Sequence, residues 1–423
     1  MKVCIGCNSF DEMVDKKNFY PAFLAAYKGN SSRPSSEKYL NNLSKNLAEA
    51  RRLLVTGKYK VGKYTTFMVY EPKPRKIKAL PFKDRVIQHV LFDYINPRLD
   101  KTFIFYSYAN RNGKGIHKGI EVEKGFLRKC GKGSYVIKGD IYHFFDSIDK
   151  DILMRLLYKK IRDIKILNLC RQFIYMDKKP TGIAIGNVTS QLFANVYLNE
   201  LDHFVKDRLR IKNYIRYMDD FCINVKTKQE AKEILEKITI FLKEKLHLLL
   251  NGKTQIFPER QGVNFLGGMI KFSHVKIRHK TVKRIKHNIN KWKKRLQDET
   301  MSRDLYIAVL YKQFNSWFGL ASKLNCRTII IKIYQMIEQL GIADPLDGKT
   351  NNKERINNIK KLLKHKYFLR MVTENTFKKI VKERKKHDKI YKEAEFYNDM
   401  DYKLHRFYDV YLKTGTVAFI HPG

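Results

Sequence analysis

Two adjacent carboxylates stand between two short runs of β-branched and aromatic residues, and this stretch constrains the fold more than any other. It runs over residues 214–225, with Asp219 and Asp220 near its centre. Such runs on either side of a short polar pair predict strand, tight turn and strand. Neighbouring acids repel each other, so a hairpin that carries them beside buried strands usually has cations nearby. These residues alone leave two interpretations open: a divalent-metal site, or a solvated Asp-Asp turn.

A second acidic segment favours the metal site. Residues 135–140 are typical of a strand that ends at Asp140, and the aromatic residues Phe144 and Phe145 follow it. One Asp from this strand and two from the hairpin give three carboxylates, whose oxygens are the ligands that hard cations prefer. Two such ions about 3.5–4 Å apart can activate an attacking 3′-hydroxyl and stabilise the leaving pyrophosphate. The pattern therefore predicts polymerase chemistry.

At these motifs the sequence resembles the palm of reverse transcriptases. Tyr217-Met218-Asp219-Asp220 and residues 140–145 carry the resemblance. Further blocks follow in the order that the family has, at residues 71–77, 80–86, 107–109, 111–115, 182–202, 253–254 and 265–267. Together they cover about residues 60–270. The sequence is most similar to prokaryotic enzymes, namely group II intron relatives, diversity-generating retroelements and defence-associated reverse transcriptases.

The resemblance implies an α+β fold of the right-hand polymerase type, with fingers, a palm built on an antiparallel sheet, and a helical thumb. We expect an N-terminal helical segment at 1–60, fingers at 61–134, and a palm with some fingers elements at 135–275. A helical thumb at 276–345 and a basic helical extension at 346–423 complete the expected organisation.

The same resemblance implies the roles of individual residues. The metal contacts it implies are Asp140, Ile141, Asp219 and Asp220, with Asp220 the more peripheral acid. Lys253 is implied as the residue that protonates the departing pyrophosphate, whereas the residue pattern alone also fits a surface lysine in a turn. Contacts to the incoming nucleotide are implied for Lys73, Arg75, Phe145, Ile185, Gly186 and Gln191. The segment that contains Phe265, Leu266 and Gly267 resembles the primer grip, an exposed apolar hairpin that supports the primer terminus.

Two basic loops have a physical reason to meet phosphates. Residues 64–69 and 77–82 predict a hairpin whose tip carries Lys73 and Arg75, and these cations would clamp a triphosphate or simply be solvated. Glycines in residues 110–115 permit close backbone approach to phosphates, while Arg111 and Lys114 supply charge. Because this loop lacks phosphate-loop spacing, we expect it to contact the template or primer backbone.

Two positions bear on which nucleotides are used. An aromatic ring at Phe145 is either a core residue or, as the resemblance implies, a steric gate that excludes a 2′-hydroxyl and selects deoxynucleotides. Ile185 stands where most relatives have Gln, and with Gln191 after Ser190 it matches the pattern of error-prone retroelement enzymes. Loss of an amide near the templating pair removes hydrogen bonds, which is a physical reason for relaxed discrimination.

Helical spacing of apolar residues predicts the remaining elements. Helices are expected at 35–54, 84–91, 192–202, 226–250 and 280–296. Residues 349–423 are Lys-rich and aromatic, which fits either RNA binding or a small helical cap with a solvated face.

Charge decides the class of partner. Lys and Arg total 85 against 42 acids, a net charge of +43, which favours polyanions and salt-dependent binding. We therefore expect an RNA template or noncoding RNA, a DNA product and dNTPs as partners, with an accessory protein or a second copy as further candidates. The sequence contains no run of about 18 apolar residues and no secretory signal, so we expect a cytoplasmic protein without a membrane partner. Cys4 and Cys7 have zinc-ligand spacing but no second pair, and we expect reduced thiols.

The expected activity is RNA-directed DNA synthesis with two Mg²⁺ ions, or Mn²⁺ in their place, on a dedicated structured noncoding RNA. Antiphage defence and a diversity-generating retroelement are the two roles that fit. Two alternatives stay open. One is a template-independent or protein-primed DNA polymerase of the same fold, and the other is a non-catalytic RNA-binding scaffold.

Overall fold

A computed structural model describes residues 9–297, apart from 29, 31, 32, 70–73 and 178, together with residues 321, 324 and 326–338. The chain divides into two compact units, residues 1–275 and residues 276–423. Helices and antiparallel sheets are both present, so the predicted α+β class is confirmed.

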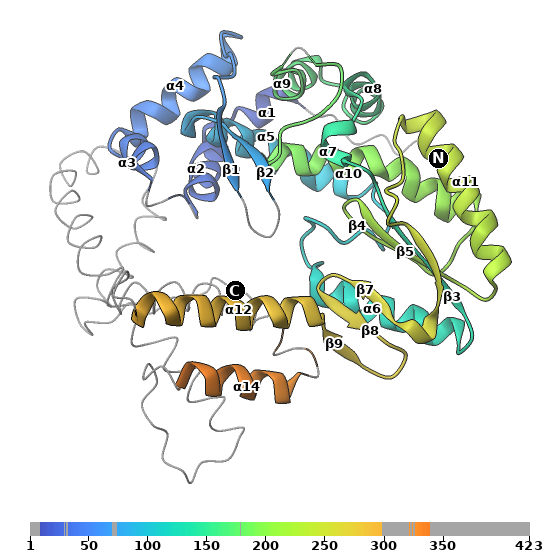
Figure 1. Cartoon of the computed structure of the whole chain (residues 1–423). Helices are drawn as coiled ribbons and strands as arrows, with labels where there is room; N and C mark the ends of the chain where they lie inside the picture. Colours follow the sequence, from blue (N-terminus) through green and yellow to red (C-terminus); the bar gives the residue numbers. More distant parts are fainter. Residues whose placement is uncertain are drawn as a thin grey trace. The chain divides into compact units, whose positions relative to one another are not determined.

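A four-stranded antiparallel sheet forms the centre of the first unit (Figure 1). Its strands are β4 (Tyr214–Tyr217), β5 (Asp220–Val225), β3 (Tyr135–Asp140) and β6 (Gln255–Pro258), in that spatial order. Strands β4 and β5 are joined by the two-residue turn Met218-Asp219, in which Met218 adopts a left-handed conformation with φ of 58°. The predicted strand, tight turn and strand are therefore confirmed.

Helices cover both faces of this sheet, which is why its strands are apolar on both faces. Helix α10 (Val188–His203) and helix α11 (Lys228–Leu246) lie on one face, and α6 (Ile116–Cys130) lies on the other (Figure 1). The residues of β5 from Phe221 to Val225 are all buried. Gly139 of β3 leaves room for the ring of Phe221, because a Cβ atom at Gly139 would overlap that ring.

A second group of elements packs around the long helix α5 (Phe82–Asp100). The N-terminal helices are α1 (Phe10–Met13), α2 (Phe19–Tyr27), α3 (Pro34–Leu40) and α4 (Leu43–Val55). The rings of Phe23, Tyr39 and Phe82 pack edge to face or stacked where α2, α3 and α5 meet. Strands β1 (Thr65–Val69) and β2 (Arg75–Ala79) pair antiparallel, which confirms the predicted hairpin. Its second strand lies at 75–79 instead of the expected 77–82, so Arg75 begins the strand and Phe82 begins α5.

The first unit contains several further helices and helical turns. They are α7 (Phe144–Ser147), α8 (Lys150–Lys160), α9 (Ile164–Ile174), the π-helical turn Phe204–Arg208, and the 3₁₀ turns Lys16–Asn18 and Glu259–Gln261. A small sheet in the order β7 (Val263–Phe265), β8 (Gly268–Ile270) and β9 (Val275–Ile277) follows, and the first unit ends within β9.

Several helix ends differ from the sequence prediction. The helix expected at 35–54 is two helices, because the pair Asn41-Asn42 interrupts it and the Asn46 side chain donates a hydrogen bond to the Tyr39 carbonyl oxygen (2.8 Å). Helix α11 is shorter than expected because Thr227 caps its start and His247, in a left-handed conformation, ends it. Helices α5 and α10 both begin earlier than predicted.

In the second unit, helix α12 (His279–Gln297) packs with helix α14 (Arg327–Glu338). The predicted helix at 280–296 is thus confirmed, and its residue Ile289 is buried. The predicted extension at 346–423, most of the rest of the expected thumb, and Cys4 and Cys7 lie outside the described residues. None of the described helices combines the length and the apolar character that crossing a membrane requires.

Candidate active site

Strand pairing brings the three predicted catalytic acids together. In the ladder between β3 and β5, Asp140 lies directly opposite Asp220, and Asp219 occupies the turn that precedes β5. Residues opposite each other in an antiparallel ladder have Cβ atoms about 4.5–5.5 Å apart and project to the same face of the sheet. Three carboxylates from two distant segments therefore share one end of the sheet.

The charges of these acids affect one another. Burial raises the pKa of the Asp219 carboxyl, and the neighbouring Asp140 carboxylate raises it further. Lys138 and Arg75 act in the opposite direction and lower the pKa of Asp219. A cation close to Asp219 and Asp140 would thus relieve a repulsion that the fold imposes, and Arg75 is near enough to contribute.

A lysine that the sequence prediction missed contacts one of the acids. The Lys138 ammonium forms an ion pair with Asp220 Oδ1, and it also lies 5.3 Å from the centre of the Phe265 ring. Lys138 stands two residues before Asp140 on β3, so both side chains project to the same face. The signal in the sequence was a charged residue inside an otherwise apolar strand, which usually indicates a partner of opposite charge.

The acids could supply part of the ligand set of a metal ion, with substrate phosphates and waters as its other ligands. Among the residues that the structure describes, no group of three or more His, Cys, Asp or Glu side chains is gathered closely enough to hold an ion by itself. Mg²⁺ commonly binds through one or two carboxylates, with waters and substrate phosphates as its other ligands. Asp140 and Asp219 could supply such carboxylates. Ile141, also expected as a metal contact, is buried and could offer only its backbone oxygen.

A buried ion pair fixes the turn that carries Asp219. Arg216 of β4 and Asp202 of α10 are both 0% exposed and form two parallel hydrogen bonds of 2.7 and 2.6 Å. The Arg216 guanidinium also donates to the carbonyl oxygen of Met218 (3.0 Å), in the turn itself. Its remaining donors reach Asn195 Oδ1 (3.2 Å) and Ser107 Oγ (3.1 Å). The guanidinium therefore connects the turn that carries Asp219 to helix α10 and to the loop before α6.

A second turn is fastened to the backbone of Asp140. The Asn251 amide donates to the Asp140 carbonyl oxygen (2.7 Å), and the Asp140 amide donates to Thr254 Oγ1 (3.3 Å). Lys253 lies between these two anchors and is exposed. The structure therefore places the Lys253 backbone next to the acids, while the predicted proton transfer to pyrophosphate stays a prediction.

The loop before α10 joins the residues predicted to meet the nucleotide. The carbonyl oxygen of Ile185 accepts from the Lys78 amide of β2 (3.4 Å), and that of Phe145 accepts from the Ile183 amide (2.9 Å). Gly186 has φ of 110°, and a Cβ atom there would lie 3.1 Å from the Ile77 side chain. Strand β2, which Arg75 begins, therefore abuts this loop.

The other predicted nucleotide contacts are less closely defined. Phe145 is partly buried against the core, and Gln191 is partly exposed in the first turn of α10. Lys73 lies outside the described residues.

Arg111 and Lys114, expected at nucleic acid, are bound to protein groups. The Arg111 side chain is only 8% exposed, pairs with Asp100 (2.5 Å), and donates to the carbonyl oxygens of Ile104 and Ser107. Lys114 donates to the Phe105 carbonyl oxygen (2.7 Å). Arg111 thus holds its own loop together, which does not favour the predicted contact to phosphate. Lys114 is partly exposed, and its predicted contact stays a prediction.

The hairpin between β7 and β8 differs from the expected exposed apolar tip. Phe265 is 0% exposed, so the expectation is wrong for this residue, whose ring belongs to the core below the turn. Leu266 and Gly267, with φ of 50° and 86°, form the turn and are partly exposed. Leu266 packs against α6, where a Cβ atom at Gly119 would meet its Cδ1 atom at 2.5 Å.

A buried carboxyl lies under the same face of the sheet. Glu123 of α6 is fully buried, and both of its oxygens lie within 3.2 Å of Asn224 Nδ2 on β5. Burial raises the pKa of Glu123 to about 7, although the hydrogen bonds from Asn224 and the charge of Lys138 partly oppose this shift. Glu123 is therefore easily protonated in the folded protein.

The region that contains the site is similar to known proteins. Residues 65–270 match the family described as reverse transcriptase (RNA-dependent DNA polymerase). Protein YkfC of Escherichia coli K12 is 30% identical over 248 residues, which are 47% of this chain and 65% of that protein. The group II intron-encoded protein LtrA of Lactococcus lactis subsp. cremoris is 26% identical over 364 residues, 67% of this chain and 60% of that protein.

The chain thus spans less than two thirds of the length of these two relatives. Among solved structures, telomerase from Candida albicans in complex with a fragment of telomeric RNA aligns with a TM-score of 0.41 at 12% identity. That alignment covers 73% of this chain and 64% of the telomerase chain.

Replacing Asp202 with Asn should destabilise the first unit by about 3–5 kcal/mol, because Arg216 would stay buried without a counter-charge. Asp207→Asn is the matched control, since Asp207 forms an exposed pair with His203 and should cost less than about 1 kcal/mol. Denaturant unfolding of the two variants measures the difference. Equal small losses would contradict the role of Arg216 in holding the turn.

Glu123→Gln should flatten the dependence of stability on pH. The pKa of Glu123 rises from 4.5 to about 7 on folding, so the folded state holds this proton more tightly. The associated stability is fully present below pH 4.5 and is lost as pH rises through about 7. The wild type should therefore lose about 3 kcal/mol relative to Glu123→Gln between pH 4.5 and pH 8.

Unfolding by denaturant at several pH values measures this loss. Glu121→Gln, at an exposed position of the same helix, should leave the pH profile unchanged. Parallel profiles for the wild type and Glu123→Gln would show that Glu123 is already ionised in the fold.

Proposed function

Because residues 65–270 match the reverse transcriptase family, we propose that this protein is an RNA-directed DNA polymerase that extends a DNA strand from dNTPs. Its fold is of the right-hand polymerase type, and the four-stranded sheet is the palm. The observation that carries the proposal is the pairing of Asp140 with Asp220 beside Asp219 in the turn.

The acids hold the reaction centre in this proposal. Asp140 and Asp219 bind divalent ions, two Mg²⁺ or Mn²⁺, and Asp220 is the peripheral acid because Lys138 already pairs with it. When bound, such ions polarise the attacking 3′-hydroxyl and neutralise the leaving pyrophosphate. Burial and, to a lesser extent, the neighbouring Asp140 carboxylate raise the pKa of Asp219, which supports a cation at this position.

Residues of the β1–β2 hairpin and the loop before α10 hold the nucleotide. Arg75, whose charge reaches Asp219, donates to phosphate oxygens, and Lys253 provides a proton to pyrophosphate from the turn fastened to Asp140. Phe145 limits the space at the sugar. Ile185 offers no hydrogen bond near the templating pair, which lowers fidelity.

The proposal also includes the template RNA and the biological role of the enzyme. A net charge of +43 supports a long polyanionic partner, which we take to be a dedicated structured noncoding RNA copied into cDNA. The chemistry serves antiphage defence or a diversity-generating retroelement, with an accessory protein or a second copy as further partners. Sequencing the nucleic acid that copurifies with the protein identifies the template.

Asp140→Asn and Asp219→Asn should each lower deoxynucleotide incorporation on a primed RNA template by about a thousandfold, because each removes several kcal/mol of charge stabilisation. Binding of the same RNA should be retained, since these acids do not attract phosphates. Asp207→Asn is the control for loss of one exposed carboxylate and should be fully active.

Retained synthesis in Asp140→Asn and Asp219→Asn would overturn the proposal. A product whose sequence ignores the supplied RNA, or a product covalently attached to protein, would favour template-independent or protein-primed synthesis. A wild-type protein that binds RNA without incorporating any nucleotide would favour the scaffold.

Phe145→Ala should admit ribonucleotides, with discrimination against them falling about ten- to two-hundredfold, because a steric barrier at the sugar is worth about 1–3 kcal/mol. Competition between dNTPs and NTPs in primer extension measures the ratio. Tyr142→Ala, which removes a half-exposed ring nearby, should leave the ratio unchanged. Unaltered selectivity in Phe145→Ala would show that the ring only packs.

A further inference from the structure

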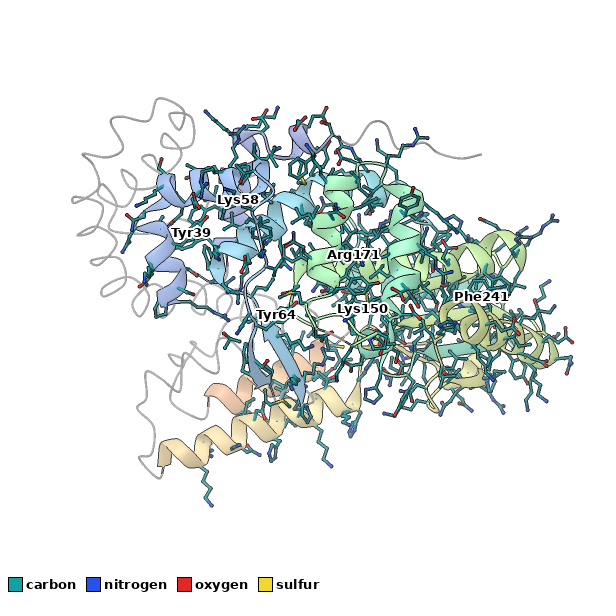
Figure 2. All side chains as sticks on the ribbon, turned by 90° about the horizontal axis from the view of Figure 1, so that it is seen from above. Tyr39, Lys58, Tyr64, Lys150, Arg171 and Phe241 are labelled. Carbon is teal, nitrogen blue, oxygen red and sulfur yellow. The ribbon has the colours of Figure 1, made fainter. Side chains whose placement is uncertain are left out.

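A cavity away from the three acids lies between the start of β1 and the end of α9. Its volume is about 480 Å³, and its lining includes Lys60, Lys63, Tyr64, Gln172, Tyr175 and Met176. One wall is the extended segment that precedes β1, and the other is the end of α9 with the residues that follow it. Figure 2 shows Tyr64 at the base of the hairpin, and Lys150 and Arg171 on the helices α8 and α9.

The first wall is held rigidly although it has no regular secondary structure. The buried carboxylate of Asp84 accepts from the Tyr59 hydroxyl (2.8 Å) and from the Gly62 amide (3.2 Å). The Val61 amide donates to Gln172 Oε1 on the opposite wall (3.3 Å). A Cβ atom at Gly62 would lie 2.7 Å from Asp84 Oδ2, so only glycine fits. Lys60 and Lys63 project from a fixed backbone and are exposed.

The second wall places cations around an aromatic ring. Arg171 and Lys150 lie 5.5 and 5.7 Å from the centre of the Tyr175 ring. Lys150 and Lys78 both pair with Asp177, and Lys78 also lies 6.0 Å from the centre of the Tyr64 ring. The tyrosine rings therefore sit among fixed cations.

Positive charge exceeds negative charge around the cavity. The cations are Lys60, Lys63, Lys78, Lys150 and Arg171, and the acids in contact with this set or with the lining are Asp84, Asp151 and Asp177. Aromatic rings and a thioether beside exposed lysines are the surface that single-stranded nucleic acid prefers, since bases pack on rings and phosphates meet ammonium groups. A purely apolar ligand would make no ionic contact with these lysines.

We propose that this cavity binds one unpaired nucleotide of a single-stranded RNA, with its base beside Tyr64 and Tyr175 and its phosphates at Lys60 and Lys63. A contact chain connects the cavity to the catalytic region. The Tyr64 hydroxyl accepts from Asn187 Nδ2 (3.0 Å), and Asn187 directly follows Gly186 in the loop before α10. If the proposed function holds, the bound nucleotide is a template residue that has not yet been copied.

The test uses the full chain with Lys60→Glu and Lys63→Glu combined. Lys232→Glu with Lys237→Glu, two exposed positions on α11, gives an equal change of charge elsewhere. Affinity is measured for an RNA–DNA duplex with a single-stranded RNA overhang and for the same duplex without it. The cavity variant should lose about tenfold or more for the overhang duplex, as expected for a stacked base with its phosphates, and little for the blunt duplex. The control should treat both duplexes alike.

Crosslinking locates the contact without any need for catalysis. An RNA with 4-thiouridine in the overhang should crosslink to Tyr175 or Met176 in the wild type and in Asp219→Asn, and less in the cavity variant. This readout survives even if the protein proves not to polymerise DNA, so failure of the proposed function is distinguishable from failure of the cavity proposal.

Three outcomes would overturn the cavity proposal. Equal losses in the cavity and control variants would show only diffuse charge attraction. A raised KM for dNTPs with unchanged affinity for the overhang would assign the cavity to a free nucleotide. Crosslinks confined to other segments, with both variants melting at the wild-type temperature, would show that the strand does not enter the cavity.

Discussion

The buried pair of Arg216 and Asp202 is the interaction on which the acid-bearing end of the sheet depends. Two ions taken wholly out of water are stable only when hydrogen bonds satisfy them on all sides, and here the donors of Arg216 reach Asp202, Asn195, Ser107 and the Met218 carbonyl. Such a network tolerates few other arrangements. It therefore fixes a turn whose residue Met218 adopts an unfavourable left-handed conformation.

Around this turn the fold collects like charges and then offsets them. Asp140, Asp219 and Asp220 gather because β3 and β5 pair in one register, and a slip by one residue would send Asp140 to the opposite face. Lys138 and Arg75 reduce the repulsion without removing it. The remaining repulsion among these acids favours binding of a further cation. Beside them, hydrogen bonds tie the loop before α10 to β2 and to α7.

The sequence predicted those features that depend on local pattern. Strand, turn and strand around Asp219, the hairpin of β1 and β2, and helix α12 follow from alternation and helical spacing. Helix ends were predicted less well, because Asn46 and Thr227 fix them through specific hydrogen bonds. The exposure of Phe265 was misjudged, since an aromatic residue in a loop looks the same in sequence whether it faces solvent or the core.

Lys138 connects two sequence motifs, the Asp219-Asp220 turn region and the β7–β8 hairpin. Its ammonium group touches the carboxylate of Asp220 and lies against the ring of Phe265, beneath the turn of the β7–β8 hairpin. Redesign of that hairpin to accept another kind of strand would move the ring, and with it the cation. A change in the β7–β8 hairpin would therefore alter the electrostatic potential at Asp220, although Asp220 itself is unchanged.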